Sequence, residues 1–141
     1  MTVAKPATAP APAVTQEHVN GWKYTVMLGD FIVLGLSAWV MIYGLAAYIL
    51  GIIFIAWSAV GMVGTYQGTL GLCKSNVAMF STFALFHLIV GILYFVFWQA
   101  WVSGVISLVF VGVGICFAYM AFHHLKGLKA LAAATKPPLP V

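Results

Sequence analysis

Two ionisable residues, Asp30 and His87, lie within segments that are otherwise apolar. Inside a lipid bilayer a central Asp costs about 2.5–3.5 kcal/mol, so such a residue usually faces another helix or a partner. A carboxylate beside an imidazole relieves the desolvation cost of both groups. We therefore predict that Asp30 and His87 form a hydrogen-bonded intramembrane polar pair. The same residues suit a proton relay, and His87 alone suits an axial ligand for a chlorophyll-type pigment.

The composition shows why these segments are expected to lie in a membrane. The chain has 141 residues, of which 64% are hydrophobic and 6% are charged, with a net charge of +4. A soluble domain carries about 25% charged residues, so this chain cannot cover a water-exposed surface. No basic cluster would neutralise several phosphates, which argues against nucleic acid as a partner. The expected partners are the lipid bilayer and other integral membrane proteins, with homo- and hetero-oligomers both open.

The apolar part of the chain divides into four predicted helices. A hydrocarbon core about 30 Å thick requires ~20 helical residues for each crossing. The predicted helices cover residues 23–44, 47–67, 77–98 and 101–124. Because the connections between them are short, neighbouring helices must be antiparallel. The predicted fold is an all-α membrane protein, an antiparallel bundle of four transmembrane helices within residues 22–125.

The two ends of the chain differ from this bundle. Residues 1–21 and 126–141 hold all six prolines, and their Ala/Pro-rich and Lys/Pro-containing sequences predict mobile tails. All six lysines lie in segments that four crossings place on one side of the membrane. The positive-inside rule therefore predicts both termini in the cytosol or in an equivalent compartment such as the stroma. The expected location is the plasma membrane or an endomembrane, with a thylakoid or other organelle membrane as the alternative.

The depths of Asp30 and His87 in the predicted helices support their pairing. Asp30 lies ~12 Å along its helix from Trp22, and His87 lies ~15 Å from Val77, at 1.5 Å per residue. Both residues share a helix face with small residues, which predicts that both point into the bundle. His87, for example, is three and four residues from Ala84 and Gly91.

Small residues at helical spacing predict the faces on which the helices pack. Helices in lipid associate through close packing and a few polar contacts, because apolar surface gains little by leaving lipid. The predicted packing residues are Ser37, Gly44, Gly51, Ser58, Gly64, Gly68, Ser103, Ser107, Gly114 and Ala118. Gly64 and Gly68 form a GxxxG motif, which indicates either internal packing or a dimerisation face.

The remaining reactive residues predict no catalytic or metal site. Cys73 and Cys116 have neither zinc-site spacing nor a plausible disulfide geometry. Cys73 stands beside Lys74 at the predicted cytosolic boundary and is a candidate for S-acylation. The sequence shows no Ser/His/Asp set, no paired carboxylates, no Gly-rich phosphate loop and no HExxH motif. We therefore predict no enzyme and no cofactor, with a chlorophyll-type pigment on His87 as the alternative.

Three stretches in the first three predicted helices match the pattern of a known family of membrane proteins. Residues 22–31, Trp-Lys-Tyr-Thr-Val-Met-Leu-Gly-Asp-Phe, are similar to the first tetraspanin helix, with Asp30 at the place of its polar residue, usually Asn. Residues 61–76 are similar to the second helix and the short cytosolic loop. The resemblance implies that a juxtamembrane cysteine such as Cys73 is palmitoylated. Residues 87–91, His-Leu-Ile-Val-Gly, lie where tetraspanins commonly place an acid followed by a small residue.

The resemblance covers residues 22–98 and does not extend to the connection after them. Tetraspanins have a large disulfide-bonded loop with a Cys-Cys-Gly motif there, whereas this chain has Phe-Trp-Gln-Ala-Trp. MARVEL proteins and COPI-associated Golgi proteins are alternative four-helix families of similar size. We predict a non-enzymatic membrane organiser or scaffold that associates laterally with other membrane proteins. The alternatives are an accessory subunit of a photosynthetic or respiratory complex, with a pigment on His87, and a small transporter or channel.

Overall fold

The chain folds into four α-helices joined by short connections. The computed structural model describes residues 15–41 and 45–135, and no strand is present in these ranges. The helices are α1 (Gln16–Val40), α2 (Leu45–Gln67), α3 (Leu70–Val96) and α4 (Trp101–Ala134). The predicted all-α membrane bundle of four helices is confirmed.

Within the described residues, three helices are long and apolar enough to cross a bilayer. These stretches are Tyr48–Gln67, Leu70–Val96 and Trp101–Ala134. Helix α1 has 25 residues but is less apolar, because it carries Glu17, Lys23 and Asp30. The structure therefore supports a membrane protein, and the crossing by α1 stays a prediction.

Helix α1 begins at Gln16, before the predicted start at residue 23. Thr15 is its N-cap, and the Thr15 hydroxyl accepts a hydrogen bond of 3.3 Å from the His18 amide. Such a bond satisfies one of the free amides at a helix start, and Glu17 in the first turn complements the helix dipole. The apolar boundary at Trp22 therefore lies inside the helix, and part of the predicted tail is helical.

The connection between α2 and α3 is much shorter than the predicted loop, because Gly68 ends one helix and the next begins at once. Gly68 has φ of +68°, a conformation that favours glycine. The Gly68 amide donates to the Thr65 carbonyl at 3.3 Å, and the Thr69 amide donates to the Gly64 carbonyl at 3.0 Å. This paired arrangement satisfies the last carbonyls of α2. Helix α3 consequently starts at Leu70, seven residues earlier than predicted.

Helix α4 continues to Ala134, beyond the predicted end at residue 124. The extension is held by the bundle: the His124 Nδ1 atom hydrogen-bonds to the Val19 carbonyl at 3.2 Å, and Leu125 is buried. Most of the predicted C-terminal tail is therefore helical up to Ala134. The rest of both predicted tails, residues 1–14 and 136–141, lies outside the described residues.

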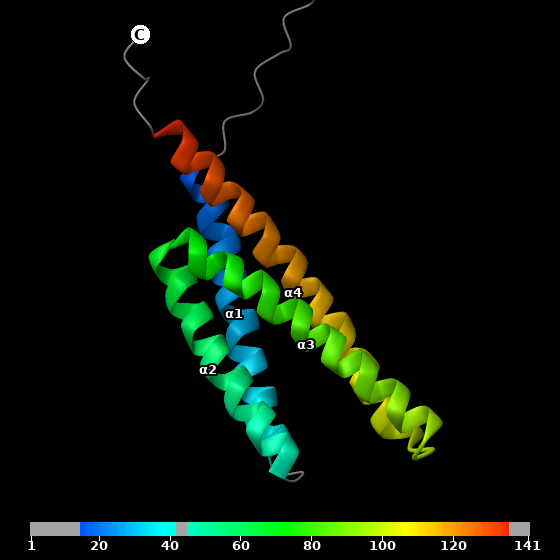
Figure 1. The fold of residues 1–141 in the computed structure, drawn as a ribbon. Coiled ribbons are helices and arrows are strands. Elements are labelled where there is room, and N and C mark those ends of the chain that lie inside the picture. The colour runs from blue at the N-terminus through cyan, green and yellow to red at the C-terminus, as the bar shows by residue number, and fades with distance from the viewer. Residues whose placement is uncertain (1–14, 42–44, 136–141) are drawn as a thin grey trace, which may run out of the picture.

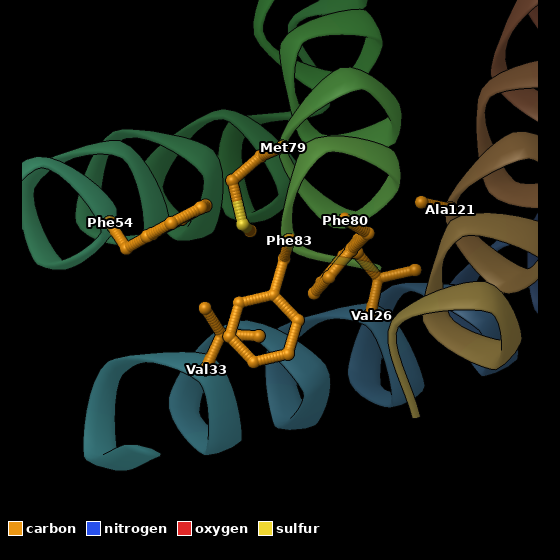
Figure 2. Close-up of a cluster of buried hydrophobic side chains, with 7 residues drawn as sticks. All are labelled: Val26, Val33, Phe54, Met79, Phe80, Phe83 and Ala121. Atoms are coloured by element: carbon orange, nitrogen blue, oxygen red, sulfur yellow. The ribbon is translucent and has the colours of Figure 1, made fainter. Parts of the chain in front are cut away.

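The four helices form two hairpins that pack as a ring. Helix α1 packs against α2 and α4, and α3 packs against the same two helices, so α1 and α3 are diagonal. Figure 1 shows the hairpins close together near the start of α1 and the end of α4, and diverging toward their other ends. The hydrophobic core draws on all four helices, as Figure 2 shows. Its buried members are Val26, Val33, Phe54, Met79, Phe80, Phe83 and Ala121.

The inward face of each helix follows steps of three and four residues, which is the spacing of left-handed helix packing. On α3 the buried residues are Cys73, Asn76, Met79, Phe80, Phe83, Ala84, His87 and Gly91. On α1 the buried side chains include Val26, Asp30, Val33 and Ser37. Asp30 and Asn76 thus lie on the inward faces of α1 and α3, at the same spacing as the core residues.

Candidate functional site

Four buried polar side chains from α1, α2 and α3 meet near the α2–α3 connection. This polar cluster consists of Asp30, Ser58, Thr65 and Asn76, and each of the four is 0% exposed. The Asn76 amide nitrogen donates to Asp30 Oδ2 at 2.9 Å and to Thr65 Oγ1 at 2.9 Å. The Ser58 hydroxyl donates to the Asp30 backbone carbonyl. A single amide group therefore links three helices.

The predicted hydrogen bond between Asp30 and His87 is not formed. Asp30 Oδ2 is bonded to Asn76, Asp30 Oδ1 has no partner, and the His87 Nδ1 atom bonds to the Phe83 carbonyl at 3.0 Å. The reason is the early start of α3. His87 lies eleven residues beyond Asn76, or about 16 Å along the helix axis at 1.5 Å per residue. The prediction that both residues are buried is correct, and the predicted pairing is wrong.

Three aromatic rings surround His87. The centroid of the His87 ring lies 4.2 Å from that of Phe83, 5.3 Å from Phe86 and 5.1 Å from Phe110. His87 is 6% exposed. Edge and tilted contacts of this kind stabilise packed aromatic clusters. The ring is therefore built into the α3–α4 interface.

A small cavity lies beside His87. It has a volume of about 10 Å³ and is lined by Ser37, Leu50, Gly51, Phe54, Phe83, Phe86 and His87. That volume accommodates roughly one water molecule. Phe83, Phe86 and Phe110 pack against His87, and the cavity beside it is far smaller than a chlorophyll-type ring. Pigment binding by His87 stays an alternative.

Gly61 allows the polar cluster to form. A Cβ atom at position 61 would overlap Asn76 Oδ1, so only glycine lets the amide approach α2 this closely. Next to the cluster, the Trp57 indole nitrogen donates to the Ser75 hydroxyl at 2.7 Å. Together with the bond from Asn76 to Thr65, this contact joins α2 and α3 beside the close approach at Gly61.

Cys73 does not occupy the exposed boundary position expected for S-acylation. It lies in the first turns of α3, is 1% exposed, and its thiol faces the Gly64 carbonyl at 3.5 Å. The predicted exposed position is wrong, and the burial follows from the early start of α3. A covered thiol is a poor acyl acceptor, and S-acylation of Cys73 stays a prediction. Cys116, by contrast, is exposed.

Most of the predicted packing residues lie at helix interfaces. Those that are buried are Ser37, Gly51, Ser58, Gly64, Ser107 and Gly114. Gly68, Ser103 and Ala118 are half-buried, and Gly44 lies outside the described residues. A Cβ at Gly114 would stand 2.9 Å from the Ala84 Cβ, which shows how closely α3 and α4 approach.

The GxxxG pair has two separate uses within the bundle. A Cβ at Gly64 would overlap Leu72 of α3, so Gly64 serves packing between α2 and α3. Gly68 provides the left-handed residue that ends α2. These roles match the internal-packing interpretation of the motif, and the dimerisation interpretation stays a prediction.

Asn76 is the site residue that the sequence did not reveal. It falls within the predicted connection after residue 67, so its side chain had no assigned face. The signal was its spacing: Asn76 precedes Phe80 by four residues, Phe83 by seven and His87 by eleven, on one face of a continuous helix. Thr65 and Ser58 show the same spacing on α2.

Comparison with family models, curated proteins and solved structures gives no match to this chain. The arrangement of the polar cluster must therefore be interpreted from its own geometry. It ties helices together, and within the described residues no group of three or more His, Cys, Asp or Glu side chains could hold a metal ion.

Proposed function

We propose that this protein is a non-enzymatic membrane organiser that associates laterally with another integral membrane protein through the outward face of α4. The observation that carries the proposal is the low burial of this helix. In the most apolar stretch of α4, 17% of the residues are buried inside the bundle, against 33% in α2 and in α3. Helix α4 contributes Ala121 to the core and packs against α3 and α1, but of the three candidate membrane spans it leaves the largest share of its residues outside the bundle.

The outward face of α4 combines large apolar side chains with two small residues. Its exposed large side chains are Val105, Leu108, Val109, Ile115, Tyr119 and Phe122. Between them lie Gly112 and Cys116, four residues apart and both exposed. A Cβ at Gly112 would have no neighbour within 4 Å, so this glycine does not serve packing within the bundle. Small residues four apart let a second helix approach closely, which favours a helical partner.

We also infer how the bundle is oriented, with α1 as a fourth crossing. Helix α1 has 25 residues and packs along the apolar helix α2. Lys23, Lys74, Lys126 and Lys129 all belong to the end of the bundle that holds the α2–α3 connection and the last turns of α4. The positive-inside rule assigns that end to the cytosol or the stroma. The resemblance of residues 22–98 to tetraspanins favours the same four-crossing organiser.

The proposal predicts that Gly112→Leu separates the protein from its partner without unfolding the bundle. Leucine would fill the space that a close helix needs, while nothing inside the bundle stands within 4 Å. The measurement is native purification from the source membrane, with mass spectrometry of the companion proteins at matched yield. Gly35→Leu is the matched control, because Gly35 is also exposed and without neighbours but lies on α1.

We expect a companion present in fixed proportion with the wild type and with Gly35→Leu, and strongly reduced with Gly112→Leu. Equal recovery from all three proteins would contradict an interface on α4. The identity of the companion distinguishes the hypotheses: recovery of a photosynthetic or respiratory complex would favour the accessory-subunit alternative.

A further inference from the structure

Two oxygen atoms in the polar cluster lack a hydrogen-bond donor. They are Asp30 Oδ1 and Asn76 Oδ1, and both are buried. The Asn76 amide nitrogen cannot donate to either oxygen, because it already donates its two hydrogens to Asp30 Oδ2 and Thr65 Oγ1. Buried polar atoms are nearly always hydrogen-bonded, so two orphan acceptors on one bonded pair of side chains require an explanation.

No positive charge compensates an ionised Asp30. Among the residues that the structure describes, Asp30 forms no ion pair, and its one side-chain partner is the neutral amide of Asn76. On the same helix, the Lys23 ammonium lies over the Tyr66 ring, 4.5 Å from its centroid. An unpaired carboxylate in an apolar interior carries a large desolvation cost, and such a group usually becomes neutral instead.

The titratable groups on the neighbouring helices have other partners. On α3, the Cys73 thiol faces the Gly64 carbonyl, and His87 bonds to the Phe83 carbonyl. On α4, His124 bonds to the Val19 carbonyl at 3.2 Å. Helix α2 contributes only the hydroxyls of Ser58 and Thr65 to the cluster. None of these groups supplies a cation to Asp30.

The surroundings of Asn76 Oδ1 leave no room for a metal cation. Asn76 Oδ1 lies where a Cβ of residue 61 would stand, pressed against the backbone of α2. Sodium or calcium would need several further oxygen ligands around it. A proton needs no such space, and it turns one of the two acceptors into a donor for the other.

We propose that Asp30 is a proton-binding site: its carboxyl group carries a proton on Oδ1 and donates it to Asn76 Oδ1. The acid and the amide are then joined by two hydrogen bonds, one in each direction, and both orphan acceptors are satisfied. The carboxyl group becomes neutral, so no charge is buried at the α1–α3 contact. The proton comes from water when the chain folds, and it returns to water when the bundle opens.

This site makes the stability of the bundle depend on pH in a defined direction. At neutral pH the folded protein holds a proton on Asp30. The unfolded chain does not, because an exposed aspartate loses its proton at about pH 4. The free energy of unfolding therefore falls as pH rises, because the folded state binds more protons than the unfolded state. Asp30→Asn replaces the acid by a neutral amide of the same shape, which donates without titrating. Its stability should lack the part of the pH dependence that Asp30 contributes.

The test uses the purified full chain in detergent and two measurements. Infrared absorption detects a protonated carboxyl group at neutral pH, and the chain has only two acidic side chains, so one substitution assigns the band. Thermal unfolding is followed from about pH 5 to about pH 8. Glu17→Gln is the matched control, because Glu17 is an exposed acid on the same helix.

We expect the protonated carboxyl band in the wild type and in Glu17→Gln, and its loss in Asp30→Asn. We also expect the unfolding temperature to fall with rising pH in the first two proteins and to change less in Asp30→Asn. Absence of the band from the wild type at neutral pH would overturn the proposal, even if Asp30→Asn fails to fold. A drop in wild-type stability when sodium is replaced by a bulky organic cation would also overturn it, because a metal ion would then occupy the site.

Discussion

Gly61→Ala is expected to lower the free energy of unfolding of the bundle by about 2–4 kcal/mol, through overpacking and the loss of buried hydrogen bonds. The added Cβ would overlap Asn76 Oδ1. Asn76 would have to move, and its bonds of 2.9 Å to Asp30 and to Thr65 would break together. All three atoms that would crowd the added Cβ belong to the Asn76 side chain, so the overlap is relieved only when this side chain leaves its present position.

Unfolding of the purified protein in detergent, by heat or by added denaturing detergent, measures this effect. Gly35→Ala is the control, because Gly35 lies within α1 and has no neighbour within 4 Å of an added Cβ. Alanine favours helix over glycine by up to about 1 kcal/mol, so the control should be as stable as the wild type or slightly more stable. Equal stability of Gly61→Ala and Gly35→Ala would show that α2 and α3 do not meet at Gly61 in this way.

Asn76→Ala should lower the free energy of unfolding by about 2–3 kcal/mol, because it leaves Asp30 and Thr65 buried without their shared donor. Ser81→Ala is the comparison on the same helix: Ser81 is exposed, and its hydroxyl bonds within α3 to the Val77 carbonyl at 2.8 Å. This control should change stability by less than about 0.5 kcal/mol.

A double-mutant cycle shows whether the loss at Asn76 acts through Asp30. Once Asp30→Ala has removed the carboxyl group, Asn76→Ala no longer leaves that group unsatisfied. The double variant should therefore be destabilised by less than the sum of the two single variants. Additive losses would place the contribution of Asn76 elsewhere, for example in its bond to Thr65.

Composition and periodicity were sufficient to predict the fold, because both follow from the requirement that apolar side chains face lipid or each other. The helix ends were not predictable in the same way. Hydropathy changes at Trp22, but capping by Thr15 starts α1 earlier. A glycine with φ of +68° compresses the α2–α3 connection into a tight turn. These are local backbone effects that an apolar profile does not record.

The error in the candidate site follows from those helix ends. Asp30 was correctly predicted to face the interior, because its spacing along α1 matches that of its small neighbours. Its partner was assigned by depth, and the depth of His87 depended on α3 starting at residue 77. Because α3 starts at Leu70, Asn76 lies at the depth of Asp30 and bonds to it. For the same reason Cys73 lies in the packed interface and not at the predicted boundary. One early helix start thus accounts for both corrections.

Photocrosslinking from position 116 tests lateral association through α4 most directly. A photoreactive residue in place of Cys116 would lie on the outward face of α4, and one in place of Phe31, which is 66% exposed on α1, provides the control. We predict one discrete adduct with an integral membrane protein from position 116 in the source membrane, none from position 31, and loss of the adduct when Gly112→Leu is added. Lipid adducts alone at position 116, or the same protein adducts from both positions, would contradict the account.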